Sequence, residues 1–317
     1  MNVNLKQRFQ EILEDNRILE AELMSRHTTF RIGGPADFFL VPENADEIRK
    51  IIAVCKEKNV PYFILGNGSN LLVGDGGFRG VVLQIFKKMN DVRVEGERVT
   101  AQAGVLLSKV ASAAYNASLT GLEFAAGIPG TLGGAVRMNA GAYGGEMKQV
   151  LESAVVLTQE GELLTIPVEE LGLAYRTSVV EKKDYVVVEA TLRLKKGDQA
   201  AIREVMDDLK QRRVTKQPLE FGSAGSTFKR PKGYFAGKLI EDAGLRGFRI
   251  GDAQVSEKHC GFVINRGNAT AAHAGSCKES ERDFRSNAGA GSEKDRRVLG
   301  CVLLSLRECR EQESLRL

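Results

Sequence analysis

The sequence has few of the residues and patterns on which several specialised protein classes depend. Its 317 residues include five cysteines, an odd number without a CxxC pair, and three widely separated histidines. This argues against a disulfide framework and against a zinc site, so we expect no metal. No run of about 18 apolar residues occurs, and the charged start of the chain has no apolar core of a signal peptide. We therefore expect a cytoplasmic protein without membrane contact.

Strong charge of one sign is also missing. The net charge of +4 is too small to argue for nucleic acid as a partner, although anionic small molecules stay open as ligands. With 43% hydrophobic and 27% charged residues, the composition is that of an ordinary globular protein. A chain of 317 residues exceeds the size at which one core stops growing, so we expect two or three lobes.

Two familiar phosphate-binding patterns are absent, GxxxxGK[ST] and a GxGxxG followed by an acidic residue. In their place stands a glycine-rich stretch, Ala125–Gly144, which we call the cradle: AAGIPGTLGGAVRMNAGAYG. Glycine lets the main chain approach a ligand closely, and successive N–H groups can surround an anion. We interpret the cradle as a phosphate-binding segment around which the chain is organised. The alternative is a purely structural loop.

Apolar spacing and turn residues predict the elements that precede the cradle. Residues 5–23 are expected to form one or two amphipathic helices. A strand at 36–41, a helix capped by Asn44 and a strand at 61–66 form a predicted βαβ unit. A second loop of small and amide residues follows from Gly66, at the end of a strand, where open α/β sheets bind ligands. Strands at 81–86 and 92–104, turning at Gly96, and a helix through Val110 lead to the cradle.

Beyond the cradle we expect a mixed sheet and then a smaller lobe. Residues 154–166 form a predicted hairpin that turns at Glu160-Gly161, and 185–194 alternate as a strand. A charged helix over 200–216 ends before Pro218 and connects to the smaller lobe. That lobe is predicted to hold a helix over 234–243 and a strand over 261–265.

Three further short groups have residue types that would be costly unless they are functional. The first is Tyr175-Arg176-Thr177-Ser178, in which an arginine can hold a carboxylate by two charge-assisted bonds of about 1.5 to 3 kcal/mol each. The others are the glycine- and serine-rich 222–229 and the basic stretch 244–265, which includes Arg246, Lys258 and His259. Taken singly, they could equally be a surface arginine, a flexible turn and a basic surface.

Taken in order, these stretches closely resemble the UDP-N-acetylenolpyruvoylglucosamine reductases, the flavoenzymes that make UDP-N-acetylmuramate for bacterial cell walls. The resemblance covers about residues 20 to 270, in six motifs that begin at His27, Ile64, Ala126, Tyr175, Gly222 and Lys238. The short final lobe, without an extra loop near residue 240, is similar to the compact form of the family.

The resemblance implies an α+β fold with a two-lobed FAD-binding domain of the p-cresol methylhydroxylase type and a smaller α/β substrate-binding domain. We place the FAD-binding domain with its N-terminal helices at 1–199, the substrate-binding domain at 200–272 and an atypical tail at 273–317. It further implies an NADPH-dependent oxidoreductase with non-covalent FAD and a UDP-sugar substrate, acting in peptidoglycan synthesis and so in cell wall biogenesis, cell shape and cell division. We expect a monomer.

The resemblance also implies roles for individual residues. Arg176 would hold the substrate carboxylate, and Ser226 would be the proton donor that completes the lactyl group. Tyr175, Arg246, Lys258 and His259 would contact the substrate. The residues expected to bind FAD are Gly66, Asn67, Gly68, Ser69, Asn70, Leu71, Gly127, Ile128, Gly130, Thr131, Gly133, Gly134, Asn139 and Gly141.

The tail is where the sequence departs from this family. The likeness stops at His273, and three of the five cysteines fall from Cys277 onward. Where the family has a glutamate that assists protonation, the nearest alignment places Asp295. One alternative is therefore an FAD-binding homologue with weak or no turnover. Another is a sugar or alcohol oxidase of the same flavin superfamily.

Overall fold

The computed structural model describes residues 2–231 and 233–279, which fall into two compact units. The first unit takes the described residues up to Glu22, then Ala36–Asn67 and Arg79–Thr215. The second combines Leu23–Pro35, Gly68–Phe78 and the described residues from Lys216 onward. Two early segments of the chain thus belong to the second unit. The predicted division at residues 199 and 272 uses continuous stretches of chain and does not include these segments in the later domain. That division stays a prediction.

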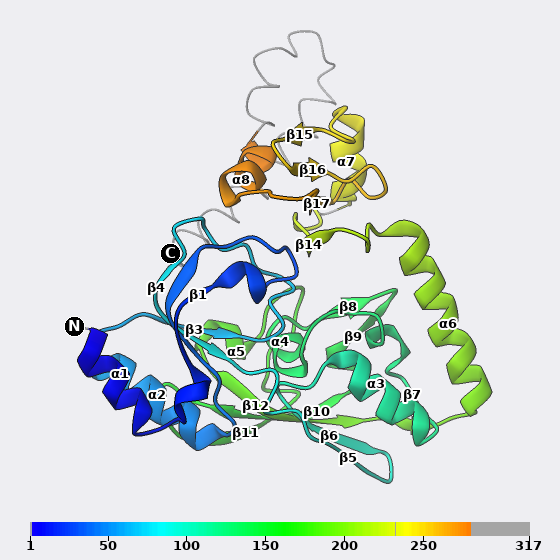
Figure 1. Ribbon diagram of the computed structural model, residues 1–317. Coiled ribbons are helices and arrows are strands. Elements are labelled where there is room, and N and C mark those ends of the chain that lie inside the picture. The colour runs from blue at the N-terminus through cyan, green and yellow to red at the C-terminus, as the bar shows by residue number, and fades with distance from the viewer. Residues whose placement is uncertain (1, 232, 280–317) are drawn as a thin grey trace. The chain divides into compact units, whose positions relative to one another are not determined.

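A small sheet in the order β1-β2-β4-β3 lies at the N-terminal side of the first unit (Figure 1). Its strands are β1 (Ile18–Leu23), β2 (Pro35–Leu40), β3 (Tyr62–Leu65) and β4 (Phe78–Gln84), and β3 runs parallel to β4. Helix α2 (Ala45–Glu57) joins β2 to β3, and the Asn44 side chain caps it by accepting a 2.9 Å hydrogen bond from the N–H of Glu47. The predicted strand-helix-strand unit is confirmed, with β4 between its two strands.

The prediction of helices throughout residues 5–23 is wrong in its second half. Helix α1 (Asn2–Gln10) packs Phe9 edge-on against Phe38, with ring centroids 5.4 Å apart, but a short 3-10 turn at Asp15–Arg17 then leads into strand β1. Buried Arg17 fixes this change of direction through two hydrogen bonds to the Glu47 carboxylate, at 2.7 and 3.1 Å. The apolar spacing of this segment is compatible with a helix and with a strand, and pairing with β2 selects the strand.

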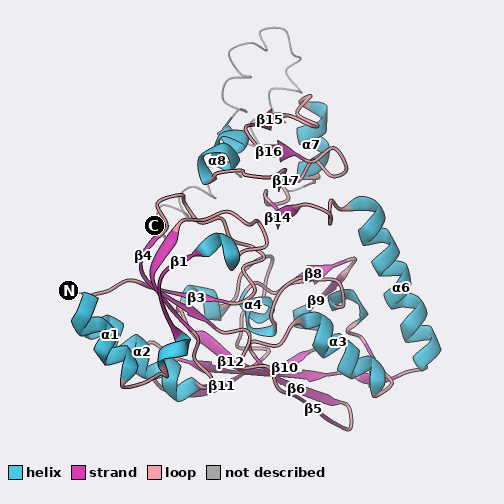
Figure 2. Cartoon of the chain, in the orientation of Figure 1, coloured by secondary structure: helices cyan, strands magenta, loops and turns pink. Residues whose placement is uncertain are grey.

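The main sheet of the first unit is antiparallel throughout, in the order β11-β10-β12-β6-β5 (Figure 2). Gly96 (φ +61°) and Gly161 (φ +87°) sit in the two predicted hairpin turns, where positive φ favours glycine. The strands are β5 (Val92–Glu95), β6 (Arg98–Gln102), β10 (Leu151–Leu157), β11 (Leu163–Pro167) and β12 (Val186–Arg193). All of them match the strands expected from the sequence.

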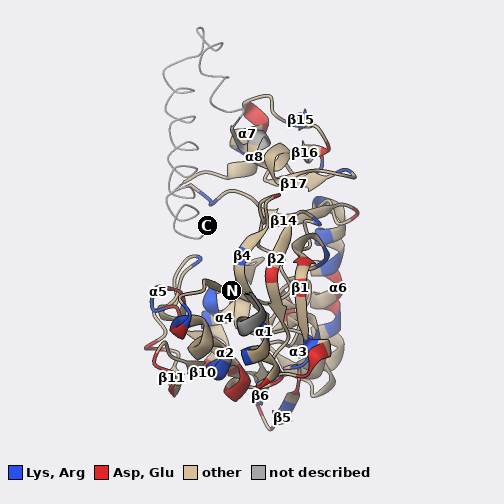
Figure 3. Ribbon diagram, turned by 60° about the vertical axis from the view of Figure 1, so that its left-hand side comes forward, with Lys and Arg blue, Asp and Glu red and all other residues tan. Residues whose placement is uncertain are grey.

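Helices α3 (Leu107–Asn116) and α4 (Leu132–Arg137) pack on this sheet, α4 chiefly against β12. The predicted connector is helix α6 (Gln199–Lys216), which is strongly charged (Figure 3) and buries Ile202 against the unit. The remaining short elements of the unit are β7 (Leu119–Thr120), the 3-10 turns Glu123–Ala125 and Met147–Gln149, β8 (Gly141–Ala142), β9 (Gly145–Glu146), α5 (Val179–Lys182) and β13 (Lys195–Lys196).

The cradle is more regular, and more deeply packed, than a glycine-rich loop would be. Helix α4 occupies its centre, and the β8-β9 pair begins near its end. Leu132, Ala135 and Val136 are buried in the core of the first unit. The cradle therefore contributes to the core of the first unit, because α4 presents an apolar face to the sheet.

The second unit is built on a sheet in the order β14-β17-β16-β15. Its elements are β14 (Gly222–Ser226), α7 (Ala236–Asp242), β15 (Arg249–Ile250), β16 (Ala253–Val255), β17 (Phe262–Asn265) and α8 (Ala271–Glu279). Asp75 caps α8 by accepting hydrogen bonds from the N–H groups of Ala271 and Ala272, at 2.8 and 3.2 Å. The predicted helix and strand of the smaller lobe are confirmed. Across the residues that the structure describes, no helix combines the length and apolarity needed to cross a membrane.

Candidate functional site

Two loops that lie far apart in the sequence meet in the first unit. The amide of Asn67 donates a 2.8 Å hydrogen bond to the carbonyl oxygen of Pro129 in the cradle. Beside it, a Cβ atom added to Gly66 would lie only 2.5 Å from the hydroxyl of Thr131. Glycine at 66 is therefore required for this close approach, which brings the loop after β3 against the start of α4.

The loop from Gly66 to Leu71 offers a row of unused hydrogen-bond donors. Among the described residues, none of its backbone N–H groups has a partner. Gly68 is buried, has a φ of +62° and could not carry a Cβ, which would lie 2.1 Å from the carbonyl oxygen of His27. A buried N–H without a partner is rare in proteins and indicates a site that a ligand completes. The free N–H of Gly68 therefore fits an anionic ligand.

Only part of the cradle is available for the same purpose. The N–H groups of Leu132 and Gly133 already donate to the carbonyls of Val105 and Ala103, at 2.8 and 2.9 Å, and that of Gly134 to the Thr131 hydroxyl at 3.4 Å. The expectation that successive N–H groups here face a phosphate is thus wrong for these three. In the described part of the chain, the N–H groups of Gly127, Gly130 and buried Thr131 have no partner.

Asn139 connects the end of the cradle to the turn that carries Arg176. Its side chain is buried, and its amide nitrogen donates to the Glu146 carboxylate at 3.0 Å and to the carbonyl of Ala174 at 3.3 Å. Its amide oxygen accepts the N–H of Lys148 at 2.9 Å. The amide expected to bind FAD thus holds this turn in place.

Arg176 lies at the tip of a tight turn closed by hydrogen bonds between Ala174 and Thr177, at 3.1 and 3.3 Å. Its φ of +57° is unusual for a residue with a long side chain, and such strain often marks functional positions. The guanidinium lies 5.8 Å from the ring centroid of exposed Tyr175, and no carboxylate of the described residues pairs with it. The buried hydroxyl of Ser178 donates a 2.7 Å bond to the Arg137 carbonyl in the cradle and secures the turn from its other side.

In the second unit, an irregularity in β14 sets the position of Ser226. The pairing of β14 with β17 shifts register between Ser223 and Ser226, and Gly225 takes a φ of +79°. Such a bulge turns the side chain that follows it. Ser226 is exposed, opposite Phe262, and its hydroxyl has no partner within residues 2–231 and 233–279.

The three basic residues expected to contact the substrate already have partners within the second unit. Arg246 pairs with Glu241 at 2.6 Å and also donates to the carbonyl of Glu257. The side-chain hydrogen bond with Glu241 raises the pKa of Arg246. Lys258 lies 3.8 Å from the Glu220 carboxylate.

His259 also has a packing role. Its Nδ1 accepts a 3.1 Å hydrogen bond from the N–H of Gly261, and its ring packs edge-on against Phe262. Burial lowers the pKa of His259, which fits a neutral imidazole. Asp295, the remaining predicted site residue, lies outside the described residues.

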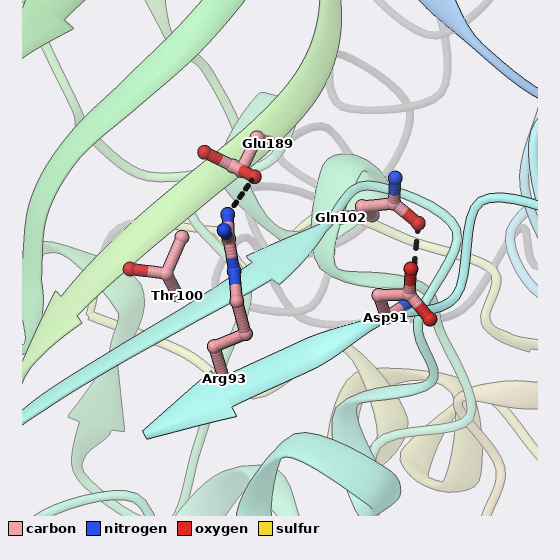
Figure 4. Close-up of a pocket in the computed structure, with 5 residues that line it drawn as sticks. All are labelled: Asp91, Arg93, Thr100, Gln102 and Glu189. Atoms are coloured by element: carbon pink, nitrogen blue, oxygen red, sulfur yellow. Dashed lines mark hydrogen bonds and ion pairs between the residues drawn. The ribbon is translucent and has the colours of Figure 1, made fainter. Parts of the chain in front are cut away.

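A separate depression of about 260 Å³ lies over strands β5, β6 and β12 (Figure 4). Arg93 reaches Glu189 across it at 3.1 Å, and the side-chain oxygen of Gln102 accepts the N–H of Asp91 at 3.1 Å. None of the predicted site residues lines it, and two pairs of its lining residues are already joined by hydrogen bonds, so we do not consider it the functional site. In the described ranges, no three His, Cys, Asp or Glu side chains gather as a metal-binding group.

Comparison with known proteins gives the family. Residues 36–167 match the model of an FAD binding domain, and residues 217–277 match that of the C-terminal domain of UDP-N-acetylenolpyruvoylglucosamine reductase. A UDP-N-acetylenolpyruvoylglucosamine reductase from Clostridium novyi (strain NT) is 55% identical over 270 residues, which cover 85% of this chain and 88% of that protein. This chain belongs to the UDP-N-acetylenolpyruvoylglucosamine reductase family.

Other relatives agree. The family member from Clostridium perfringens (strain 13 / Type A) is 58% identical over 248 residues, covering 78% of this chain and 81% of that one. The crystal structure of the family member from Thermus caldophilus superposes with a TM-score of 0.73 at 35% identity, covering 84% of this chain and 93% of that chain. The predicted α+β fold, an FAD-binding domain followed by a smaller domain, is confirmed. The second family model ends at residue 277, slightly beyond the point where the likeness was expected to stop.

Sequence reasoning gave no role to the individual residues of the motif that starts at His27. The sequence feature that could have pointed to a role is the pair Thr28-Thr29, two residues that favour local hydrogen bonds, placed shortly before Gly33-Gly34. In the structure this stretch lies against both Gly68 and Ser223 in the second unit.

Proposed function

We propose that this chain reduces UDP-N-acetylglucosamine enolpyruvate to UDP-N-acetylmuramate, with FAD as bound cofactor and NADPH as hydride source, in the synthesis of peptidoglycan precursors. Within a member of this reductase family, one observation supports the proposal most directly. Two converging loops lie within residues 36–167, which match the FAD binding domain. They present buried N–H groups that have no partner in the described chain.

The residues present fit FAD because a diphosphate needs several donors and little side-chain bulk near the main chain. Buried Gly68 and Thr131 each offer an unpaired N–H, and Gly66 leaves the space between the two loops open. The loop 66–71 and the cradle positions Gly127, Gly130 and Thr131 would hold the diphosphate. Bound there, FAD would supply hydride transfer from NADPH to the terminal carbon of the enolpyruvyl ether.

Arg176 would hold the carboxylate of the enolpyruvyl group. Hydride addition at the terminal carbon places negative charge on the neighbouring carbon and, through it, on that carboxylate. A planar guanidinium that no carboxylate of the described chain neutralises can bind both carboxylate oxygens and stabilise this charge. Exposed Tyr175 lies beside it and would contact the same substrate.

Ser226 would supply the proton that completes the lactyl group. A hydroxyl is a weak acid, and it suffices here because the enolate that it protonates is a strong base. Ser226 suits this role because its hydroxyl has no partner within the described ranges, so no internal hydrogen bond must break first.

The remaining substrate contacts of the proposal are Arg246, Lys258 and His259. Arg246 and Lys258 would meet the substrate diphosphate, and each would have to exchange a carboxylate partner for it. All the proposed residues come from one chain, so the proposal requires only a monomer.

The proposal is tested by two half-reactions without oxygen. The purified protein is loaded with FAD, reduced with NADPH and mixed with the enolpyruvyl nucleotide or with UDP-N-acetylglucosamine, which lacks the enolpyruvyl ether. We expect bleaching of the flavin band by NADPH and its return with the enolpyruvyl nucleotide alone. A protein that binds no FAD, or a flavin that both nucleotides leave reduced, would contradict the proposal. Fast reoxidation by oxygen with a sugar as donor, and no use of NADPH, would favour the oxidase alternative.

A further inference from the structure

Thr29 lies between the loop 66–71 and strand β14 and contacts both. Its N–H donates a 3.1 Å hydrogen bond to the carbonyl of Gly68. Its own carbonyl accepts the N–H of Ser223 at 3.1 Å, and its hydroxyl donates to the carbonyl of Ser223 at 2.7 Å. A single half-buried threonine thus binds both main-chain polar groups of Ser223 in the second unit.

Ser223 is the point from which the irregular part of β14 begins. On its other side it pairs with Ile264 of β17, and the next regular pairing is that of Ser226 with Phe262. Between them the register shifts, and Gly225 adopts a φ of +79°. The direction of the Ser226 side chain therefore depends on how firmly Ser223 is held, because Ser223 begins the bulge and a bulge re-aims the side chains of its strand.

The segment that carries Thr29 is itself firmly anchored. Buried Asn265, at the end of β17, donates to the carbonyls of Phe30 and Arg31 at 3.1 and 3.4 Å. Its oxygen accepts the N–H groups of Gly267 and Ala269, at 3.0 and 3.1 Å. A Cβ atom on Gly222 would lie 2.9 Å from the carbonyl oxygen of Phe30, so the segment and β14 approach each other closely. Thr29 is thus a fixed support for β14.

We infer that Thr29 is a positioning residue for Ser226: its hydroxyl holds the Ser223 carbonyl at the base of the bulge and so fixes where the proton-donating hydroxyl points. The inference rests on the proposed function, since it acts through the role of Ser226 as proton donor. Through its N–H, Thr29 ties the same strand to the Gly68 loop. The proton donor and a loop proposed to bind FAD therefore share one support.

The test compares Thr29→Val, which removes the hydroxyl at nearly constant shape, with Thr29→Ser, which keeps it. Each is made in the natural chain and with Ser226→Ala. Thr28→Val is the matched control, because the Thr28 hydroxyl donates a 3.0 Å bond to the Ile32 carbonyl and, within the described residues, makes no hydrogen bond to β14. The readouts are flavin content, the rates of the two half-reactions and, in flavin-free protein, amide hydrogen exchange across 223–226.

For Thr29→Val we expect flavin reoxidation by the enolpyruvyl nucleotide to slow about 10- to 100-fold, since small misplacements of reacting groups cost rates of this order. Reduction by NADPH and flavin content should stay within about twofold. Amide exchange across 223–226 should quicken, and Thr29→Ser should restore both readouts. With Ser226→Ala, Thr29→Val should cause no further slowing, because its effect passes through the missing hydroxyl.

Three results would overturn the inference alone: unchanged reoxidation in Thr29→Val, the same factor of slowing with and without Ser226, or equal slowing in Thr28→Val. Normal reoxidation in Ser226→Ala would overturn both the inference and the assignment of the proton donor. If Thr29→Val does not fold, Thr29→Cys gives the same comparison with a weaker donor of similar size.

Discussion

Three residues with unusual backbone conformations lie in the cradle or in the turn bound to it. Asn139, Tyr143 and Arg176 all have positive φ, at +41°, +54° and +57°. Such conformations persist only when neighbouring groups hold them. For Asn139 these groups are visible, because its buried side chain makes hydrogen bonds to Glu146 and to the turn of Arg176. The strain at Arg176 is thus supported by the cradle to which its turn is bound.

Arg176→Lys should slow flavin reoxidation by substrate at least about 100-fold. A single ammonium cannot reproduce a planar two-point grip on a carboxylate, and the developing charge would lose its main stabilising group. Stopped-flow measurement of the two half-reactions is the check. Arg93→Lys is the control, since Arg93 lies on β5 and pairs with Glu189 outside the proposed site. Near-normal reoxidation in Arg176→Lys would make Arg176 a surface residue without a role in the reaction.

His259 should make the stability of the second unit depend on pH. Burial lowers its pKa in the folded protein below the ordinary value of 6.5. As the pH falls below that value, the unfolded chain gains a proton that the folded chain does not, so stability is lost toward acid pH and fully present above it. We expect the melting temperature to fall more between about pH 7.5 and pH 5.5 in the natural chain than in His259→Asn. Equal falls in the two proteins would contradict this.

At the scale of elements, the contact between Gly66 and the start of α4 holds the two loops together. Gly66→Ala places a methyl group against the Thr131 hydroxyl, which also caps α4 by accepting the N–H of Gly134. Relieving such overlap costs about 1 to 3 kcal/mol, so the Kd for FAD should rise about tenfold or more. Titration of the flavin-free protein with FAD measures it.

Gly76→Ala is the matched control for that experiment. An added Cβ at Gly76 meets no atom within 4 Å, and its φ is not positive, so FAD affinity should not change. Equal loss of affinity in both variants would mean that the contact between Gly66 and Thr131 does not shape the site.

Most elements could be predicted because their signals are local. The cap at Asn44, the turns at Gly96 and Gly161 and the apolar face of α2 depend only on neighbouring residues. Strand β1 could not be predicted, since its conformation depends on pairing with β2 and on the contact of Arg17 with Glu47. Helix α4 has only six residues, too few for the helical spacing of apolar side chains to be recognised in the sequence.

The same distinction applies to the site. Glycine and arginine show their chemical capacity in the sequence, so the two loops and the turn of Arg176 could be proposed from it. Which N–H groups stay free could not, because Val105 and Ala103 accept those of Leu132 and Gly133 through contacts distant in sequence. The structural use of Asn139 is likewise invisible without its partner at Ala174.

At the scale of the whole molecule, the tail sets the next prediction. Beyond residue 277, where the family model ends, the residue aligned with the family's glutamate is Asp295, which is one methylene shorter, and its role stays a prediction. We expect the natural chain to bind FAD and to be reduced by NADPH, but to turn over slowly. Replacing the tail, residues 273–317, with a family-like ending should raise turnover about 100-fold or more, the usual contribution of a general acid or base.

Steady-state oxidation of NADPH measures that gain, with flavin content as the control. Asp295→Ala separates the explanations further: if it leaves the slow rate unchanged, Asp295 does not replace the family glutamate. Full activity in the natural chain, with no gain from the replacement, would show that its own ending is competent.

The composition of the second unit from three separate stretches has a consequence for synthesis of the protein. The carbonyl of Phe30 is hydrogen-bonded by Asn265, a residue 235 positions later. At translation rates of about 5 to 20 residues per second, the early stretch leaves the ribosome roughly 10 to 50 seconds before its partner exists. The first unit must therefore fold while these two stretches of chain, which belong to the second unit, still lack their partners. Nascent chains should be most vulnerable to proteases at 23–35 and 68–78 until translation passes residue 265.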